Sequence, residues 1–246
     1  MSATLLELGI DALEHKEEVE EVKRRVGITH EHFDCWVFNF LQNKNFDIDE
    51  TVRNELANID ITDYMRENMS GGIIQHCGND KEGRTVFYIV TNRDFPSSKV
   101  REERRRILDM WLLWGSRLRR GNKRSRVVLL INQKDAGVWA NTDMTFQSSV
   151  ALRIAKFYPG AFDKMYVCCM GRALAAFAKP IIGRMPSAIS DRVTIWNEKD
   201  IHGGAMLQYF DDSVLPLALG GNNDIDGPEN WKLFEKTVTE YYLRLQ

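Results

Sequence analysis

The sequence predicts an α/β protein with a mostly parallel sheet and crossover helices, preceded by a small N-terminal helical region. In the first seventy residues, apolar side chains recur at helical spacing. From residue 85 onward, short runs of β-branched and aromatic residues alternate with longer amphipathic segments, the order typical of strands joined by crossover helices. The run at residues 127–131 is apolar on both faces, as a buried parallel strand is. We therefore expect a helical region over residues 1–70 and an α/β domain over residues 71–246.

Three helices are expected in the N-terminal region. An acidic amphipathic helix runs to Val26 and stops at Gly27, a residue that commonly follows a helix C-terminus. A second helix is expected over residues 33–41, where apolar residues at three- and four-residue spacing form one face. A third is expected over residues 48–69.

In the α/β domain, a polar turn at residues 79–83 precedes the first strand run. Four strands are expected, at residues 86–90, 127–131, 165–170 and 193–196. Helices are expected between them and after them: one that follows Ser97 and presents Ile107, Leu108, Trp111, Trp114 and Leu118 inward, then others at residues 142–158, 172–185 and 231–245.

Composition excludes several classes of protein. The net charge of -2 argues against a general nucleic-acid binder. The chain has no apolar run of about 18 residues, so we expect no transmembrane helix. The four cysteines show no paired Cys-x-x-Cys spacing, which argues against a zinc site and a redox dithiol. Without a signal-peptide pattern at the N-terminus, we expect a cytoplasmic protein.

Motifs that carry catalysis are missing from the sequence. No Gly-rich phosphate loop follows any expected strand, and there is no Gly-x-Ser-x-Gly elbow and no His-Glu-x-x-His pair. We therefore expect a protein that is not an enzyme, with no catalytic residue, metal or cofactor. An α/β enzyme acting on a small metabolite is the weakest of the alternatives.

Two segments could serve membranes or lipids. Basic residues are dense from Arg101 to Arg126, which suits phosphates or an anionic membrane, although a solvated helix face partly paired with Glu102 and Glu103 explains them better. The helix at residues 172–185 is apolar on one face and is interrupted by Pro180. From periodicity alone, this helix fits an ordinary crossover helix.

Several motifs in order resemble the CRAL-TRIO lipid-binding family, which includes phosphatidylinositol-, tocopherol- and retinal-binding proteins. The similar segments are Phe40-Leu41 with Phe46-Asp47-Ile48, Asp80-Lys81-Glu82-Gly83-Arg84 before the first strand, Tyr158-Pro159, Lys179-Pro180, and Leu215-Pro216 with Gly220-Gly221. The resemblance covers about residues 33–221. It implies a lipid pocket in the α/β domain and makes the region of residues 1–70 similar to the family's N-terminal helical region. The acidic first helix and the last helix lie outside the resemblance.

In this family, the helix that corresponds to the one around Pro180 here is a gate that closes over the lipid. The resemblance therefore implies lipid contacts from this helix and from the pocket wall: Leu129, Ile131, Val150, Ile154, Leu174, Phe177, Ile181 and Met185. For a phospholipid phosphate it implies Lys44 and Arg192. The acidic position that follows Tyr-Pro in phosphatidylinositol-binding members is Gly160 here.

The resemblance predicts a monomer that binds a hydrophobic lipid and exchanges it with membranes through transient surface contact. The ligand is either a phosphatidylinositol-type phospholipid or a more apolar lipid such as a sterol, tocopherol or retinoid. The alternative is a protein-interaction module of the same fold, for example one that binds small GTPases, with a degenerate or filled pocket.

Overall fold

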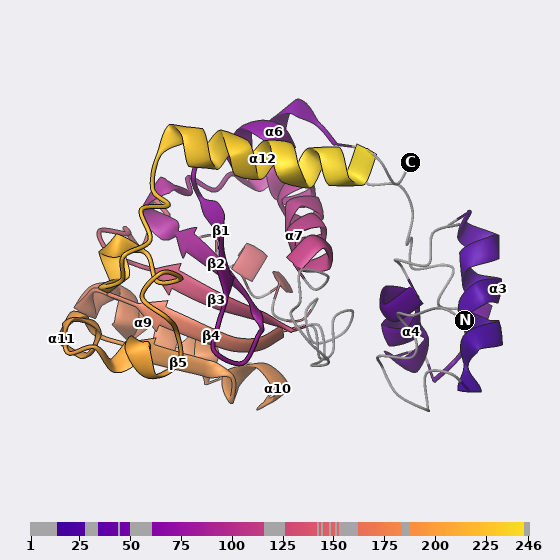
Figure 1. The fold of residues 1–246 in the computed structure, drawn as a ribbon, viewed down its shortest axis with the longest axis horizontal. Helices are drawn as coiled ribbons and strands as arrows, with labels where there is room; N and C mark the ends of the chain where they lie inside the picture. Colours follow the sequence, from indigo (N-terminus) through magenta and orange to yellow (C-terminus); the bar gives the residue numbers. More distant parts are fainter. Residues whose placement is uncertain are drawn as a thin grey trace.

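A computed structural model gives the fold of the protein (Figure 1). It describes residues 14–27, 34–43, 45–49, 61–115, 126–141, 143, 145–147, 149–150, 152, 162–183 and 187–243. Structural statements below concern these residues.

Two N-terminal helices, α3 (Lys16–Val26) and α4 (Asp34–Asn43), lie where the sequence predicts them. Gly27 ends α3 with a left-handed φ of 75°, and its backbone N–H donates to the Lys23 carbonyl. The Lys23 ammonium lies 2.6 Å from the Asp34 carboxylate, and both side chains are buried. This ion pair joins the two helices.

Helix α6 (Asp63–Ser70) is shorter than the expected helix over residues 48–69. Thr62 has an extended backbone, and its side-chain oxygen accepts a hydrogen bond from the Met65 N–H at 3.3 Å, so it is the N-cap. A continuous helix over residues 48–69 is therefore wrong, because the chain is non-helical at Ile61 and Thr62.

The sheet has five strands in sequential order: β1 (Ile74–Asn79), β2 (Thr85–Val90), β3 (Val127–Asn132), β4 (Phe162–Cys168) and β5 (Val193–Trp196). Strand β1 pairs antiparallel with β2, and the other neighbours pair in parallel. The prediction of a mostly parallel α/β fold is confirmed.

Two strand predictions need correction. Strand β1 was not expected, because Gln75, His76 and Gly78 interrupt the apolar pattern that marks a strand. Strand β4 begins three residues before the expected start and ends at Cys168. The next residue, Cys169, has a φ of 58°, a left-handed conformation that stops the extended chain.

From Arg101 onward, the described residues form helices α7, α9 and α12 and the short helices α10 and α11. Helix α12 starts earlier than expected, with a proline in its first turn, a position that proline favours. Of the expected helix over residues 142–158, the structure describes only fragments. The bounds are Arg101–Gly115 for α7, Arg172–Ile182 for α9, Ser187–Ser190 for α10, Glu198–His202 for α11 and Pro228–Leu243 for α12.

One face of the sheet is covered by α6, α7 and α12, which pack together above it (Figure 1). At the centre of this layer Phe87 of β2 meets Trp111 and Trp114 of α7 and Phe234 of α12. The Tyr242 hydroxyl donates to the Met110 carbonyl at 2.6 Å, which fixes the end of α12 on α7. Four of the five inward residues expected on α7 are buried; Leu118 lies outside the described residues.

The opposite face is covered by the chain that follows β5. This cover packs on alternate residues of the strands, and its members include Ile201, Met206, Phe210, Leu215 and Leu219.

The Leu-Pro and Gly-Gly motif shapes this covering segment. Asn223 donates its backbone N–H to the Leu215 carbonyl at 3.0 Å, which closes a tight loop. A Cβ atom on Gly221 would lie 2.1 Å from that same carbonyl oxygen, so only glycine fits there. The geometry of this tight loop therefore explains why the chain has the Leu-Pro and Gly-Gly motif there.

Partial burial of His76 on β1 should make folding sensitive to acid. Its ring lies edge-on to Trp114, with centroids 5.1 Å apart, and burial lowers the pKa of His76 to about 4 despite an opposing backbone hydrogen bond at Gly78. In the unfolded chain this histidine protonates near a pH of about 6.5. Stability from the neutral ring is therefore fully present above pH 6.5 and is lost as the pH falls toward 4.

We expect the free energy of unfolding to drop by about 2 kcal/mol between pH 7 and pH 5 from this group alone. Urea unfolding of wild type and His76→Phe at both pH values measures it. The variant, whose ring does not titrate, should lose that part of the pH dependence. Equal pH dependence in the two proteins would show that His76 is not buried as a neutral ring.

Candidate functional site

The apolar face beneath α7 is covered unevenly. The strand register places Ile89, Ile131, Val167 and Ile195 side by side in one row across β2 to β5. In the neighbouring row, Phe87 and Leu129 are buried, whereas Met165 and Val193 are partly exposed. In the first row, Val167 is buried, whereas Ile195 at the β5 end is 36% exposed.

The uneven cover follows from where the helices pack. The packed layer of α6, α7 and α12 centres on β1, β2 and the first residues of β3. Toward β4 and β5, the cover must come from the segments that connect these later strands. Right-handed crossovers between sequential parallel strands put all connecting segments on one face, and α9 connects β4 to β5. The partly exposed apolar surface therefore lies on the face of the sheet that carries the β4–β5 connection, which contains α9.

Of the eight residues expected to contact lipid, two are already buried by protein. Leu129 on β3 is 3% exposed within the packed layer, and Leu174 on α9 is also buried. Ile131 and Val150 are partly buried and pack against the same layer. The structure therefore brings Leu129, Ile131 and Val150 to one face of the sheet.

For the other residues expected to contact the lipid, the structure describes the backbone alone or nothing. Phe177 and Ile181 lie in α9, but their side chains are outside the described part of the structure. Helix α9 continues past Pro180 to Ile182. Ile154, Met185 and Lys44 are themselves outside the described residues, as is Gly160.

Arg192 directly precedes β5, and its carbonyl accepts a hydrogen bond from the Met165 N–H at 2.9 Å. Its side chain is partly exposed. A cation therefore stands at the amino end of the strand that carries Val193 and Ile195.

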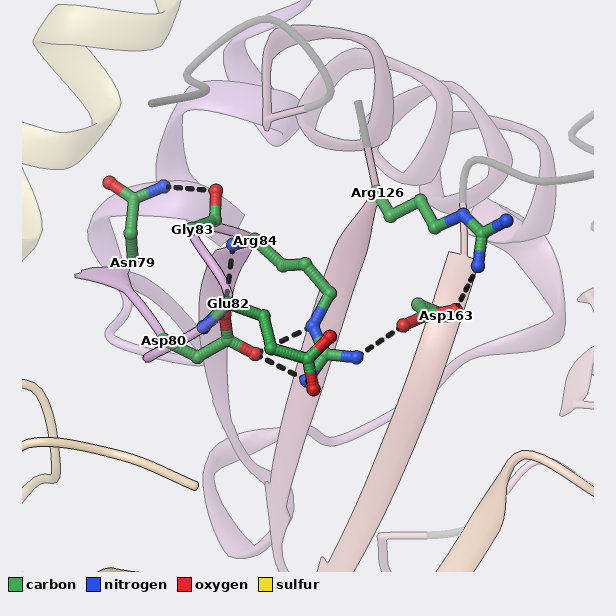
Figure 2. A network of polar contacts seen from close by, with 7 residues as sticks. All are labelled: Asn79, Asp80, Glu82, Gly83, Arg84, Arg126 and Asp163. Atoms are coloured by element: carbon green, nitrogen blue, oxygen red, sulfur yellow. Dashed lines mark hydrogen bonds and ion pairs between the residues drawn. The ribbon is translucent and has the colours of Figure 1, made fainter. Parts of the chain in front are cut away.

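A polar network crosses the amino ends of β2, β3 and β4 (Figure 2). Asp80 shapes the turn before β2: its carboxylate accepts the backbone N–H groups of Glu82, at 3.0 Å, and Arg84, at 2.8 Å. The same carboxylate accepts the Arg84 Nε–H at 2.6 Å. The family-like Asp-x-x-Gly-Arg sequence thus folds into a turn that its own ion pair fixes.

Arg84 extends this network to β4, where Figure 2 shows its guanidinium pointing to the Asp163 carboxylate. Arg126, just before β3, contacts the other oxygen of Asp163 at 2.5 Å. Burial acts to raise the pKa of Asp163, but the hydrogen bonds from Arg84 and Arg126 outweigh it and hold that pKa below its ordinary value. The network joins three strands and leaves its two arginines engaged with carboxylates.

The basic residues at the start of α7 are also paired. Arg101 makes a two-pronged ion pair with Asp143, at 2.7 and 3.0 Å, and Arg104 contacts Asp94. Arg105 lies 2.9 Å from Glu102. These pairs support the interpretation of this stretch as a structural helix face rather than an anion site.

The buried thiols are poor nucleophiles. Burial raises the pKa of Cys77 far above its ordinary value and that of Cys168 to about 12. In the part of the chain that the structure describes, no three His, Cys, Asp or Glu side chains gather as metal ligands would. None of the described helices combines the length and hydrophobicity needed to cross a bilayer.

Sequence reasoning missed Ile89 and Ile195, which are partly exposed on this face, and the buried Val167 between Ile131 and Ile195. The signal was available in part, because every second residue of a strand faces the same side. Starting from Ile131, however, the row could be extended to neighbouring strands only with their register, which the structure supplies.

Comparison with known proteins agrees with this architecture. A family model described as the CRAL/TRIO domain matches residues 69–221, which is more than half of the chain. A second model, described as a domain of unknown function (DUF7353), matches residues 6–56. No curated protein matches the sequence. Among solved structures, the fold is similar to the crystal structure of Sfh5, with a TM-score of 0.55 and 14% identity, over 85% of this chain and 82% of that one.

Proposed function

Because the chain belongs to the CRAL/TRIO domain family, we propose that it binds a hydrophobic lipid against the open half of its sheet and exchanges that lipid with membranes. Lipid binding and transfer are what the family implies. The partly exposed apolar residues Ile131, Met165, Val193 and Ile195, which lie on one face of β3 to β5, carry the proposal for this chain.

A lipid tail needs an apolar surface of this kind. Each methylene moved from a bilayer into water costs about 0.8 kcal/mol, so a long acyl chain exposed to water costs roughly 10 kcal/mol. Parallel strands are ordinarily covered on both faces. An acyl chain lying on Ile131, Met165 and Ile195 beneath α9 would supply the missing cover and shield its own methylenes.

The predicted lipid contacts fit this placement to different degrees. Ile131 and Val150 lie at the border between the packed layer and the open half, and α9 carries Leu174, Phe177 and Ile181. We keep Ile154 and Met185 as proposed contacts on the strength of the family resemblance. Leu129 would contact only the end of a tail, since protein already buries it.

For a phospholipid, we propose that Arg192 and Lys44 hold the phosphate. A cationic donor is what a phosphate oxygen requires, and Arg192 stands beside the strand that carries the open apolar residues. A phosphatidylinositol-type lipid would use both cations. A more apolar lipid would need neither of them.

Burial of Leu129 and Leu174 by protein favours a second candidate, a protein-interaction module whose pocket is filled. Native mass spectrometry of the protein as purified, followed by solvent extraction, separates the two. We expect a co-purifying lipid at one copy per chain. A protein that stays at its apo mass after challenge with lipid vesicles would contradict lipid binding and leave the interaction module.

A further inference from the structure

Two large aromatic side chains stand in solvent at one edge of the sheet. Phe95 is 73% exposed and Trp139 is 86% exposed. Phe95 follows β2 and Trp139 follows β3, and the two strands are parallel. Both residues therefore belong to loops at the carboxyl edge, opposite the polar network at the amino ends.

Trp139 is carried by a closed turn. The Asn141 backbone N–H donates to the Gly137 carbonyl at 3.1 Å, and the Gly137 N–H donates to the Asn141 side-chain oxygen at 2.8 Å. Asn141 is itself buried. Two hydrogen bonds therefore fix the backbone of the turn that carries the Trp139 indole.

The same asparagine ties this turn to the loop that carries Phe95. Its side-chain amide donates to the carbonyl of Asp94, at 2.9 Å, and to that of Asn92, at 3.3 Å. Asp94 immediately precedes Phe95. The two exposed rings therefore belong to one hydrogen-bonded unit rather than to two independent loops.

Helix α7 fastens this unit to the body of the protein. Arg104 pairs with Asp94 in the first loop, and Arg101 pairs with Asp143 beyond the second. The Arg104 guanidinium also lies 4.4 Å from the ring centroid of Phe146. These contacts hold the unit in a fixed conformation before any partner binds.

The open apolar row lies next to this edge. Ile89 is the penultimate residue of β2, and Ile131 the penultimate residue of β3. The chain then passes directly into the loops that carry Phe95 and Trp139. The rings consequently stand beyond the carboxyl ends of β2 and β3, at the edge next to Ile131, one of the residues on which we place the lipid tail.

We propose that Phe95 and Trp139 dock the protein on a lipid membrane by entering its interfacial layer. Tryptophan is enriched in this layer, and phenylalanine is among the side chains that interfacial segments bury there. Two such rings can bury only about 150–250 Å² each, well below the roughly 800 Å² per partner of a stable protein interface. A patch this small suits transient membrane contact better than a protein partner.

Charge near the rings is balanced rather than uniformly basic. Lys134, in the loop after β3, lies 3.6 Å from Glu198, and exposed Lys99 is offset by exposed Asp135. Docking should therefore depend on the rings more than on anionic headgroups, and phosphatidylcholine vesicles are a sufficient probe. The inference rests on the proposed function for its purpose, since exchange requires contact with a membrane.

The test is co-sedimentation of the full chain with phosphatidylcholine vesicles. Replacing both rings, with Phe95→Ala and Trp139→Ala, should weaken vesicle binding by about tenfold or more, because most of the apolar contact area is removed. Leu233→Ala is the matched control, because Leu233 is 61% exposed on α12 and should leave binding unchanged. Both variants should remain folded at the assay temperature, since Phe95, Trp139 and Leu233 are 73%, 86% and 61% exposed.

Brominated phosphatidylcholine gives a direct readout of insertion. Wild type should lose more tryptophan fluorescence on these vesicles than Trp139→Phe does. Equal quenching in the two proteins, or wild-type sedimentation of the double variant, would overturn the docking proposal. A chain that carries lipid while the double variant still binds vesicles overturns docking alone, whereas a chain that docks through the rings but never carries lipid overturns only the proposed function.

Discussion

Replacing Arg84 by alanine should lower the free energy of unfolding by about 3–5 kcal/mol, the usual cost of removing one partner from a buried ion pair. Arg84 and Asp80 are both buried, and the guanidinium also contacts Asp163 on β4. Without it, the Asp80 carboxylate keeps its backbone hydrogen bonds but loses its counter-charge. Urea unfolding followed by tryptophan fluorescence measures the change.

Two controls separate this network from general effects of removing an arginine. Arg24→Ala breaks an exposed pair with Glu21, in which Arg24 is 72% exposed, and should cost less than about 1 kcal/mol. Arg84→Lys keeps the charge but loses the planar fork that serves both carboxylates, so it should fall between alanine and wild type. A loss below 1 kcal/mol for Arg84→Ala would mean that the network does not stabilise the sheet.

The parts of the fold that the sequence could predict are those with strong local signals. Strands β2, β3 and β5 were predicted within a residue or two because their β-branched and aromatic runs are continuous. Helix α3 was predicted to end at Gly27 because glycine there can take a left-handed φ. Both signals reside in the segment itself.

Features that depend on distant residues could not be predicted. Strand β1 is polar in sequence and is fixed by pairing with β2, and the partner of Arg84 on β4 lies 79 residues along the chain. The docking unit likewise depends on contacts between loops, from Asn141 to the backbone of Asp94. Local periodicity carries no information about such pairings.

The same distinction explains the site. Alternation along β3 identifies Ile131 as one side of a strand, and family resemblance points to α9, yet neither indicates which part of the sheet lacks cover. That depends on α12, which lies outside the residues matched by the CRAL/TRIO model but fills the layer above β1 and β2. By completing that layer, α12 limits the proposed lipid surface to the β4 and β5 side.

Placing a carboxylate at Ile195 should weaken lipid binding strongly while the chain still folds. Ile195 faces the same side of the sheet as Ile131 and, at 36% exposure, is the most open residue of its row, so Ile195→Asp disturbs the protein's own packing less than a change at a buried residue of that row would. Against a lipid tail, however, the carboxylate would lie in a hydrocarbon environment. Charged residues cost about 2.5–3.5 kcal/mol there, which corresponds to a roughly 100-fold loss of affinity.

The measurement is lipid occupancy by native mass spectrometry, together with transfer of a fluorescent lipid between vesicles. Thr194→Asp is the matched control, because it places the same charge on the same strand but on the opposite face. It should keep its lipid, with any loss of strand stability shared by both variants. If Ile195→Asp retains wild-type occupancy while folding normally, the lipid does not lie on the open half of the sheet, and the exposed edge of β5 is ordinary protein surface.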